Sequence, residues 1–188
     1  MLNAIRSYIN DNYGSKRGLL VRGKFYCMHR LGYLRELKNV DFSRVNKLIF
    51  ICAGNICRSP LGEFYARYLG LEAESYGLNC RGGDPADPRI IAIAENLGMD
   101  VGGHVTRNIR DYRPLPDHLV VAMEPGQIEA LPTGVKSQAQ ITLAPLWYNQ
   151  PNLYLHDPYS ANPNYFDKCT TNLMGALDNL KERLDEHA

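Results

Sequence analysis

The sequence lacks any uninterrupted apolar stretch long enough to cross a membrane as a helix. Near the N-terminus, Arg6, Asn10 and Asp11 interrupt the apolar residues, so we expect no secretory signal peptide. It also lacks a disulfide framework and a zinc-ligand pattern, because its cysteines are odd in number and scattered: Cys27, Cys52, Cys57, Cys80 and Cys169. Such cysteine usage is typical of a reducing compartment, and we therefore expect a cytoplasmic protein.

Strong net charge is missing as well, but the value of +1 conceals an asymmetry along the 188 residues. Residues 1–47 carry ten lysines and arginines against three acidic residues, a net charge of +7. The rest of the chain carries 11 basic against 17 acidic residues. We therefore expect a basic, partly helical extension over residues 1–46 and one acidic globular domain over residues 47–188.

The N-terminal extension mixes its positive charge with apolar and aromatic residues. We predict helices near residues 2–10 and 27–38, with Gly14, Gly18 and Gly23 breaking the region between them. The extension either packs on the acidic domain or docks on an acidic partner or an anionic membrane surface. Nucleic acid is less favoured as a partner, because no binding motif accompanies the charge.

From Lys47 onward, short apolar runs alternate with apolar stripes at helical spacing. The runs predict strands over residues 47–51, 72–76, 118–123 and 141–144. The stripes predict helices from Ser59-Pro60 onward and over residues 88–97, 125–131 and about 164–186. This alternation indicates an α/β fold, a flavodoxin-like doubly wound sheet of four parallel strands flanked by helices. Ligands of such sheets bind outside the carboxyl ends of the strands.

The chemistry centres on the loop between the first predicted strand of the domain and its first helix, Cys52-Ala53-Gly54-Asn55-Ile56-Cys57-Arg58-Ser59-Pro60. Gly54 and Asn55 tolerate positive φ, so successive backbone N–H groups can turn inward and bind an anion at the helix N-terminus. Arg58 can add a planar, bidentate fork. In this field Cys52 is expected to be a nucleophilic thiolate at neutral pH. Ser59 is a suitable N-cap, with Pro60 at the first helical position.

A cysteine at the end of a buried strand is commonly just a small core residue, but the whole motif is far more specific. Cys-x-Gly-Asn-x-Cys-Arg-Ser-Pro resembles the low-molecular-weight protein tyrosine phosphatase family, and is most similar to its bacterial exopolysaccharide-associated type. The resemblance covers about residues 47–185. It implies that Cys52 attacks phosphorus and that Arg58 stabilises the transferring phosphoryl group. It also implies a phosphate-binding loop made of Ala53, Gly54, Asn55, Ile56, Cys57 and Ser59.

A late loop, His156-Asp157-Pro158-Tyr159, resembles the Asp-Pro-Tyr loop in which the family places its general acid. The resemblance implies that Asp157 protonates the leaving phenolate and then activates water. Tyr159 would form an aromatic wall of the substrate cleft. The segment after Ser75 lacks the tryptophan or tyrosine that many members place there, so Tyr159 is the expected wall.

Three further matches imply supporting residues around the loop. Ser75 would form a hydrogen bond with the phosphate loop, and His104 would be a partner of the loop asparagine. Glu124 would be the acid that binds the side chain of Arg58. The resemblance implies neither a metal nor a cofactor.

The implied function is metal-independent hydrolysis of phosphotyrosine through a cysteinyl-phosphate intermediate. An autophosphorylating bacterial tyrosine kinase of polysaccharide synthesis or export is the implied partner. One alternative is an arsenate reductase on the same scaffold, although no cysteine pair for its electron relay occurs between residues 81 and 168. A disulfide between Cys52 and Cys57 would switch off the nucleophile without supplying that relay. The other alternative is a non-catalytic phosphate-binding module, and the presence of Cys52, Arg58 and Asp157 together argues against it.

Substrate class depends on the loop position before the second cysteine. In the related phosphoarginine phosphatases this position resembles a threonine, whose hydroxyl can assist attack on a P–N bond. Here it is Ile56, which offers apolar surface to a phenyl ring and no hydrogen bond to a guanidinium. We therefore expect a preference for phosphotyrosine over phosphoarginine.

Overall fold

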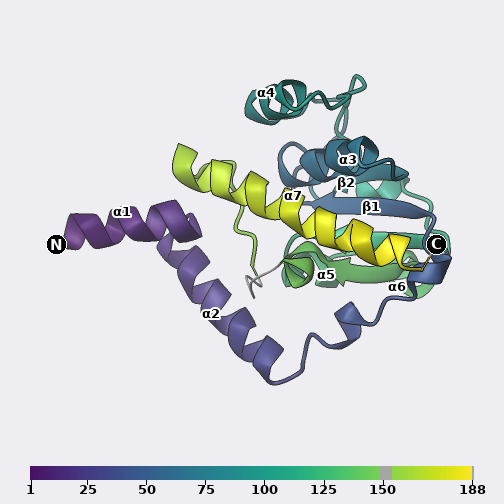
Figure 1. Cartoon of the computed structure of the whole chain (residues 1–188), viewed down its shortest axis with the longest axis horizontal. Helices are drawn as coiled ribbons and strands as arrows, with labels where there is room; N and C mark the ends of the chain where they lie inside the picture. Colours follow the sequence, from purple (N-terminus) through teal and green to yellow (C-terminus); the bar gives the residue numbers. More distant parts are fainter. Residues whose placement is uncertain (149–153, 188) are drawn as a thin grey trace.

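The computed structural model describes residues 1–148 and 154–187 and contains a parallel sheet in the order β2-β1-β3-β4 (Figure 1). Its strands are β1 (Lys47–Cys52), β2 (Ala73–Gly77), β3 (His118–Ala122) and β4 (Gln140–Leu143). The predicted α/β class and the four parallel strands are confirmed, and no strand end is shifted by more than one residue.

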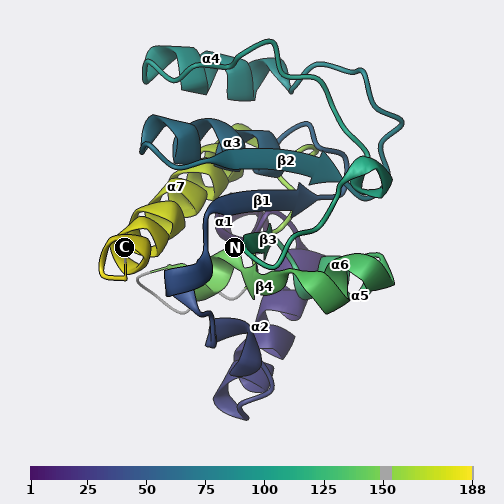
Figure 2. The same ribbon diagram turned by 90° about the vertical axis from the view of Figure 1, so that its right-hand side faces the viewer.

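Alternate residues of β1 supply two separate cores, because side chains of a strand point to opposite faces of its sheet. Leu48 and Phe50 belong to a core completed by α3 (Arg58–Tyr68) and α7 (Pro163–Asp185). Ile49 and Ile51 face a second core beside α5 (Pro125–Glu129) and α6 (Thr133–Gln138), which lie across the strands from α7 (Figure 2). Because helices cover both faces of the sheet, the side chains of β1 are buried on both faces, which explains its continuous apolar sequence.

The helices of the domain follow the predicted stripes with a few differences. The helix α4 (Pro88–Asn96) begins after Asp87, whose side chain accepts a hydrogen bond from the backbone N–H of Arg89. The expectation that Ser59 caps α3 is wrong, since that helix begins at Arg58 and Cys57 occupies the N-cap position. The short helix α6 was not predicted, because its six residues are too few to show a stripe. The remaining short turns are η3 (Ile109–Asp111) and η4 (Ala144–Trp147).

The N-terminal arm, residues 1–46, consists of α1 (Leu2–Tyr13), α2 (Lys16–Arg30), η1 (Glu36–Lys38) and η2 (Phe42–Arg44). The predicted helix over residues 27–38 is wrong, because α2 ends at Arg30. Gly18 and Gly23 lie inside α2, and of the three glycines only Gly14, with φ 74°, breaks the helices. The next helix, α2, begins directly after this break because Ser15 is its N-cap: the Ser15 hydroxyl accepts a hydrogen bond from the N–H of Gly18 at 3.0 Å.

The arm contacts the domain at several points. Asp11 Oδ1 accepts a hydrogen bond from Asn162 Nδ2 at 2.7 Å, directly at the N-cap of α7. The ring of Phe25, from α2, stacks on Tyr154 with 5.9 Å between centroids. Figure 1 shows α1 beside the start of α7 and α2 diverging from it. Many of its apolar and basic residues are exposed, so docking to an acidic partner stays a prediction. Among the residues with described structure, no helix has the length and apolar character of a membrane span.

Candidate active site

The predicted loop lies at the carboxyl end of β1, in the middle of the sheet. The chain runs from β1 to β2 on one side and then returns to β3 on the other side of β1. Such a reversal opens a crevice at the strand ends, which is where ligands of doubly wound sheets bind. Cys52 is the last residue of β1, and Arg58 is the first residue of α3.

The sulfur of Cys52 is buried and faces hydrogen-bond donors. The backbone N–H of Asn55 donates to Cys52 Sγ at 3.2 Å, and Ser59 Oγ lies 3.0 Å from the same sulfur. Ser59 Oγ already accepts a hydrogen bond from Asn55 Nδ2 at 3.0 Å, and the acceptors within reach of its own proton are the sulfur and, at 3.5 Å, the carbonyl oxygen of Tyr76. Ser59 therefore contacts the sulfur of Cys52 instead of capping the helix.

Asn55 fixes the turn of the loop. Of the two residues expected to make it, only Asn55 has a positive φ, 57°, and it is the one non-glycine residue with positive φ in the described chain. Its side chain is held at both ends: Nδ2 donates to Ser75 Oγ at 2.8 Å, and Oδ1 accepts from the N–H of Arg107 at 2.8 Å. These bonds offset the cost of the left-handed backbone, so the loop is held in its anion-binding shape.

The predicted supporting residues lie directly behind the loop. His104 Nε2 is 3.2 Å from the carbonyl oxygen of Asn55, and its ring packs edge-on against Phe64. Ser75 contacts the same asparagine and donates its own proton to Glu63 at 2.5 Å. The structure thus places Ser75 and His104 against the loop asparagine.

Glu63 is a residue that the sequence analysis missed. Its carboxylate is buried and lies 2.7 Å from Arg67, 3.5 Å from Arg107 and 3.6 Å from His104. Burial alone would raise the pKa of Glu63, but the hydrogen bonds from His104 and Ser75 and the two arginines lower it below its ordinary value. The only signal in the sequence was an acidic residue four positions before Arg67 on a helix that is otherwise apolar on this side.

Arg58 is almost fully buried, with 2% of its side chain exposed. Its Nη1 donates to Glu124 Oε1 and to the carbonyl oxygen of Leu155, both at 2.7 Å, and its Nη2 lies 3.2 Å from Asp157 Oδ2. Burial would lower the pKa of Arg58, but Asp157 and Glu124 raise it overall, so the guanidinium stays charged. Glu124 therefore forms a salt bridge with Arg58.

The Nε of Arg58 is the buried side-chain nitrogen that lacks a hydrogen-bond partner in the described part of the chain. A buried donor without a partner costs about 1–3 kcal/mol. An oxyanion bound in the loop could accept this hydrogen bond. The unpaired donor therefore points to anion binding at Arg58.

Asp157 and Tyr159 come from the predicted late loop and reach the same site. Asp157 is half-exposed, at 46%, and its Oδ1 accepts a hydrogen bond from the N–H of Tyr159 at 3.2 Å. Both residues line a cavity of about 230 Å³ together with Cys52, Ala53, Gly54, Ile56, Cys57, Arg58 and Asn79. Asn79 was not predicted. Cys52, Arg58 and Asp157 thus share one cavity whose rim carries apolar and aromatic surface.

The second loop cysteine differs chemically from the first. Cys57 Sγ is buried and lies 3.6 Å from Asp87 Oδ2. Burial, and then the charge of Asp87, raise the pKa of the Cys57 thiol well above its ordinary value. Cys57 is therefore a protonated donor and not a second nucleophile.

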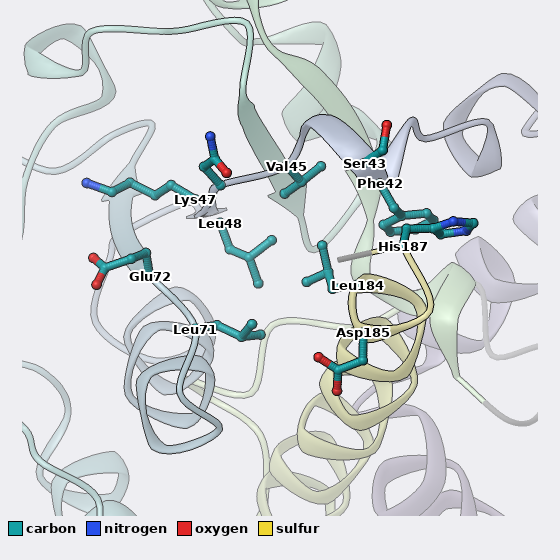
Figure 3. A pocket seen from close by; sticks show the side chains of 11 residues that line it. Phe42, Ser43, Val45, Lys47, Leu48, Leu71, Glu72, Leu184, Asp185 and His187 are labelled. Atoms are coloured by element: carbon teal, nitrogen blue, oxygen red, sulfur yellow. The ribbon is translucent and has the colours of Figure 1, made fainter.

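Another cavity, of about 220 Å³, lies at the opposite end of β1 (Figure 3). Leu48, Leu71 and Leu184 form its floor, with Lys47 and Glu72 at the edge (Figure 3). Lys47 is already paired with Glu74 at 2.9 Å. No cysteine lines this cavity, so of these two cavities it is the first that combines a cysteine, an arginine and an aspartate.

Comparisons with known proteins identify relatives of this chain. The sequence model of the family described as low molecular weight phosphotyrosine protein phosphatase matches residues 47–188. The chain is 29% identical over 146 residues to the low molecular weight protein-tyrosine-phosphatase Etp of Escherichia coli K12, covering 75% of this chain and 96% of Etp. It is 32% identical to Wzb of the same strain, covering 64% of this chain and 83% of Wzb.

Solved structures show the same fold. The crystal structure of the tyrosine phosphatase Wzb from Escherichia coli K30 in complex with sulphate aligns with a TM-score of 0.61 at 27% identity. The alignment covers 74% of this chain and 99% of that chain. That structure contains a tetrahedral oxyanion.

Proposed function

This chain belongs to the low molecular weight phosphotyrosine protein phosphatase family, and we propose that it hydrolyses phosphotyrosine in proteins through a cysteinyl-phosphate intermediate. One observation carries the proposal. A single cavity is lined by Cys52, by Arg58 with its unpaired Nε, and by the carboxylate of Asp157. These are the nucleophile, the anion-binding cation and the proton donor that the reaction needs.

In the first step the Cys52 thiolate attacks phosphorus while the bond from phosphorus to the tyrosine oxygen breaks. Asp157, in its protonated form, gives its proton to the leaving phenolate oxygen. In the second step water attacks phosphorus, Asp157 takes a proton from that water, and the S–P bond breaks to release phosphate and the thiolate. Arg58 and the backbone N–H groups of residues 53–59 stabilise the equatorial oxygens in both steps.

The cavity rim supports an aryl substrate. Tyr159 and Ile56 both line the cavity, and the exposed ring of Tyr159 can pack against a phenyl group. We propose an autophosphorylating bacterial tyrosine kinase of polysaccharide synthesis or export as the substrate, and the cytoplasm as the compartment. The support for this partner is the likeness to the exopolysaccharide-associated type.

Arsenate reduction is not proposed. Cys57 is buried against Asp87, and Cys169 is buried below the Asp157 loop, 3.8 Å from the carbonyl oxygen of His156. Neither thiol is placed to pass electrons to solvent.

The proposal is tested by measuring phosphate release from a phosphotyrosine peptide by the wild type and by Cys52→Ser. The serine variant should lose turnover but still bind the peptide in calorimetry, because an alcohol stays protonated where a thiol ionises. Cys27→Ser is the matched control, since Cys27 is exposed on the arm and should be dispensable. Turnover by Cys52→Ser would contradict the covalent mechanism. A wild type that binds but does not turn over would indicate a phosphate-binding module.

A further inference from the structure

The junction between the two helices of the N-terminal arm packs against the loop that carries Asp157. Ser15 Oγ lies 3.1 Å from His156 Nε2, and His156 is the residue immediately before Asp157. A Cβ atom added at Gly14 would collide with the His156 ring. One added at Gly18 would collide first with the carbonyl oxygen of Tyr13 and would lie 3.2 Å from the His156 ring. Gly14 in particular therefore allows this close approach.

Both ring nitrogens of His156 have partners. Its Nδ1 lies 3.2 Å from Tyr154 Oη, and the Tyr154 ring stacks on Phe25 of the arm. Burial, followed by the charge of Arg58, lowers the pKa of His156, so the ring is neutral near pH 7. Because Ser15 Oγ accepts from the N–H of Gly18, its proton is free to bond to Nε2, which leaves the ring proton on Nδ1 for Tyr154.

The carboxylate of Asp157 itself has few restraints. It contacts Arg58 at 3.2 Å and the N–H of Tyr159 at 3.2 Å, and nearly half of it is exposed. Its position therefore depends on the backbone on both sides. After it, the carbonyl oxygen of Tyr159 accepts a hydrogen bond from Arg89 Nη2 at 3.0 Å. Before it, Leu155 accepts a hydrogen bond from Arg58, and the His156 carbonyl oxygen accepts a long one, 3.5 Å, from Tyr165. The closest side-chain hydrogen bonds of His156 go to Ser15 and to Tyr154, whose ring the arm contacts.

We propose that Ser15, acting through His156, is a positioning residue for the general acid Asp157. This inference rests on the proposed phosphatase activity. The family match begins at residue 47, so the arm supplies this restraint from outside the matched region. The arm then has a role in catalysis besides any docking: it holds the acid loop so that the Asp157 proton meets the leaving oxygen.

A positioning role predicts a loss that depends on the leaving group. Dinitrophenolate leaves without a proton, whereas phenolate needs the acid. Ser15→Ala should lower kcat/KM for phenyl phosphate by roughly 10-fold, which is less than the loss expected when the general acid itself is removed. It should lower kcat/KM for dinitrophenyl phosphate by less than about 2-fold. Ser15→Thr keeps a hydroxyl and should restore the phenyl phosphate rate. Ser7→Ala is the control, because the Ser7 hydroxyl donates a hydrogen bond to Asp11 within α1.

A pair of glycine variants separates this contact from general damage to the arm. Gly14 and Gly32 both lie in the arm with positive φ, 74° and 84°, so alanine is strained at each position. At Gly14 the new Cβ would collide with the His156 ring and lie 3.0 Å from the ring of Tyr165, which also contacts the backbone of His156; at Gly32 it meets Arg35 at 3.7 Å. Gly14→Ala should reproduce the selective loss with phenyl phosphate, and Gly32→Ala should not.

The outcomes are distinct. Equal losses with both substrates in a folded Ser15→Ala, or no loss with either, would overturn the positioning role while leaving the phosphatase assignment intact. If Ser15→Ala does not fold, Gly14→Ala is compared with Gly32→Ala. The proposal is overturned if these two variants lose the same fraction of kcat/KM with each of the two substrates. Failure of the proposed function is a separate result, because the wild type would then hydrolyse neither substrate.

Discussion

Arg58 and Asp157 face each other across the candidate site, with 3.2 Å between Nη2 and Oδ2. One arginine thus contacts both acids of the site, since its Nη1 donates to Glu124 at 2.7 Å. In the proposed mechanism Arg58 stabilises the transferring phosphoryl group and Asp157 gives its proton to the leaving oxygen, so their contact brings the two roles together at one point of the site.

The role of Asp157 can be tested with Asp157→Asn. We expect kcat/KM for phenyl phosphate to fall by roughly 10²- to 10⁴-fold, because the phenolate then leaves without a proton. Dinitrophenyl phosphate should be affected much less. Asp167→Asn is the control, since Asp167 is an exposed residue on α7. Equal losses for both leaving groups would exclude Asp157 as the general acid.

The buried carboxylate of Glu63 gives a prediction about stability. Its folded-state pKa is lowered, so its stabilising effect is present above the unfolded-state value of about 4.3 and is lost as pH falls through the folded value. Glu63→Gln should therefore reduce the free energy of unfolding by about 1–3 kcal/mol at pH 7. Relative to the wild type, this deficit should shrink as the pH is lowered below about 4.

Thermal unfolding of both proteins across this pH range provides the measurement. Glu95→Gln is the control, because Glu95 is exposed near the end of α4. A deficit that is constant with pH would mean that Glu63 stabilises the fold by packing and not through its charge.

Removal of the arm is a further test. The sequence alone suggests that deleting residues 1–44 leaves the active site intact if the arm is a docking element. The contacts of Ser15 and Phe25 with the residues before Asp157 predict otherwise. We expect the truncated protein, where it folds, to hydrolyse phenyl phosphate more slowly while dinitrophenyl phosphate is affected less. Unchanged rates with both substrates would mean that the arm has no role in catalysis and acts only as a docking element.

The loop could be located from sequence because its determinants are local. Asn55 and Arg58 lie within six residues of Cys52, and the strand before them and the helix after them have clear periodicity. The contacts of Ser15 with His156 and of Glu63 with Arg107 could not be predicted. They join residues 141 and 44 positions apart, and neither pair belongs to a local pattern. Ser59 was misplaced as a cap because its hydroxyl instead turns toward the nucleophile.

Substrate class provides the last prediction, at Ile56. This side chain lines the cavity beside Tyr159, and its Cγ1 lies close to Gly54 within the loop. A β-branched apolar group there offers contact area to a phenyl ring and no acceptor to a guanidinium. One changed pocket group is worth about 1–3 kcal/mol in discrimination. We therefore expect the wild type to hydrolyse phosphotyrosine peptides roughly 10- to 200-fold faster, in kcat/KM, than matched phosphoarginine peptides.

Ile56→Thr should reduce the preference for phosphotyrosine peptides over phosphoarginine peptides. It removes apolar area that would contact a phenyl ring, and it adds a hydroxyl that can assist attack on a P–N bond. Ile56→Val is the matched control: it keeps the β-branched apolar shape and should preserve the preference. The measurement is kcat/KM for the two peptides with each variant. If the wild type hydrolysed both peptides equally well, Ile56 would not set the substrate class, and the wall formed by Tyr159 would have to accept a guanidinium as readily as a phenyl ring.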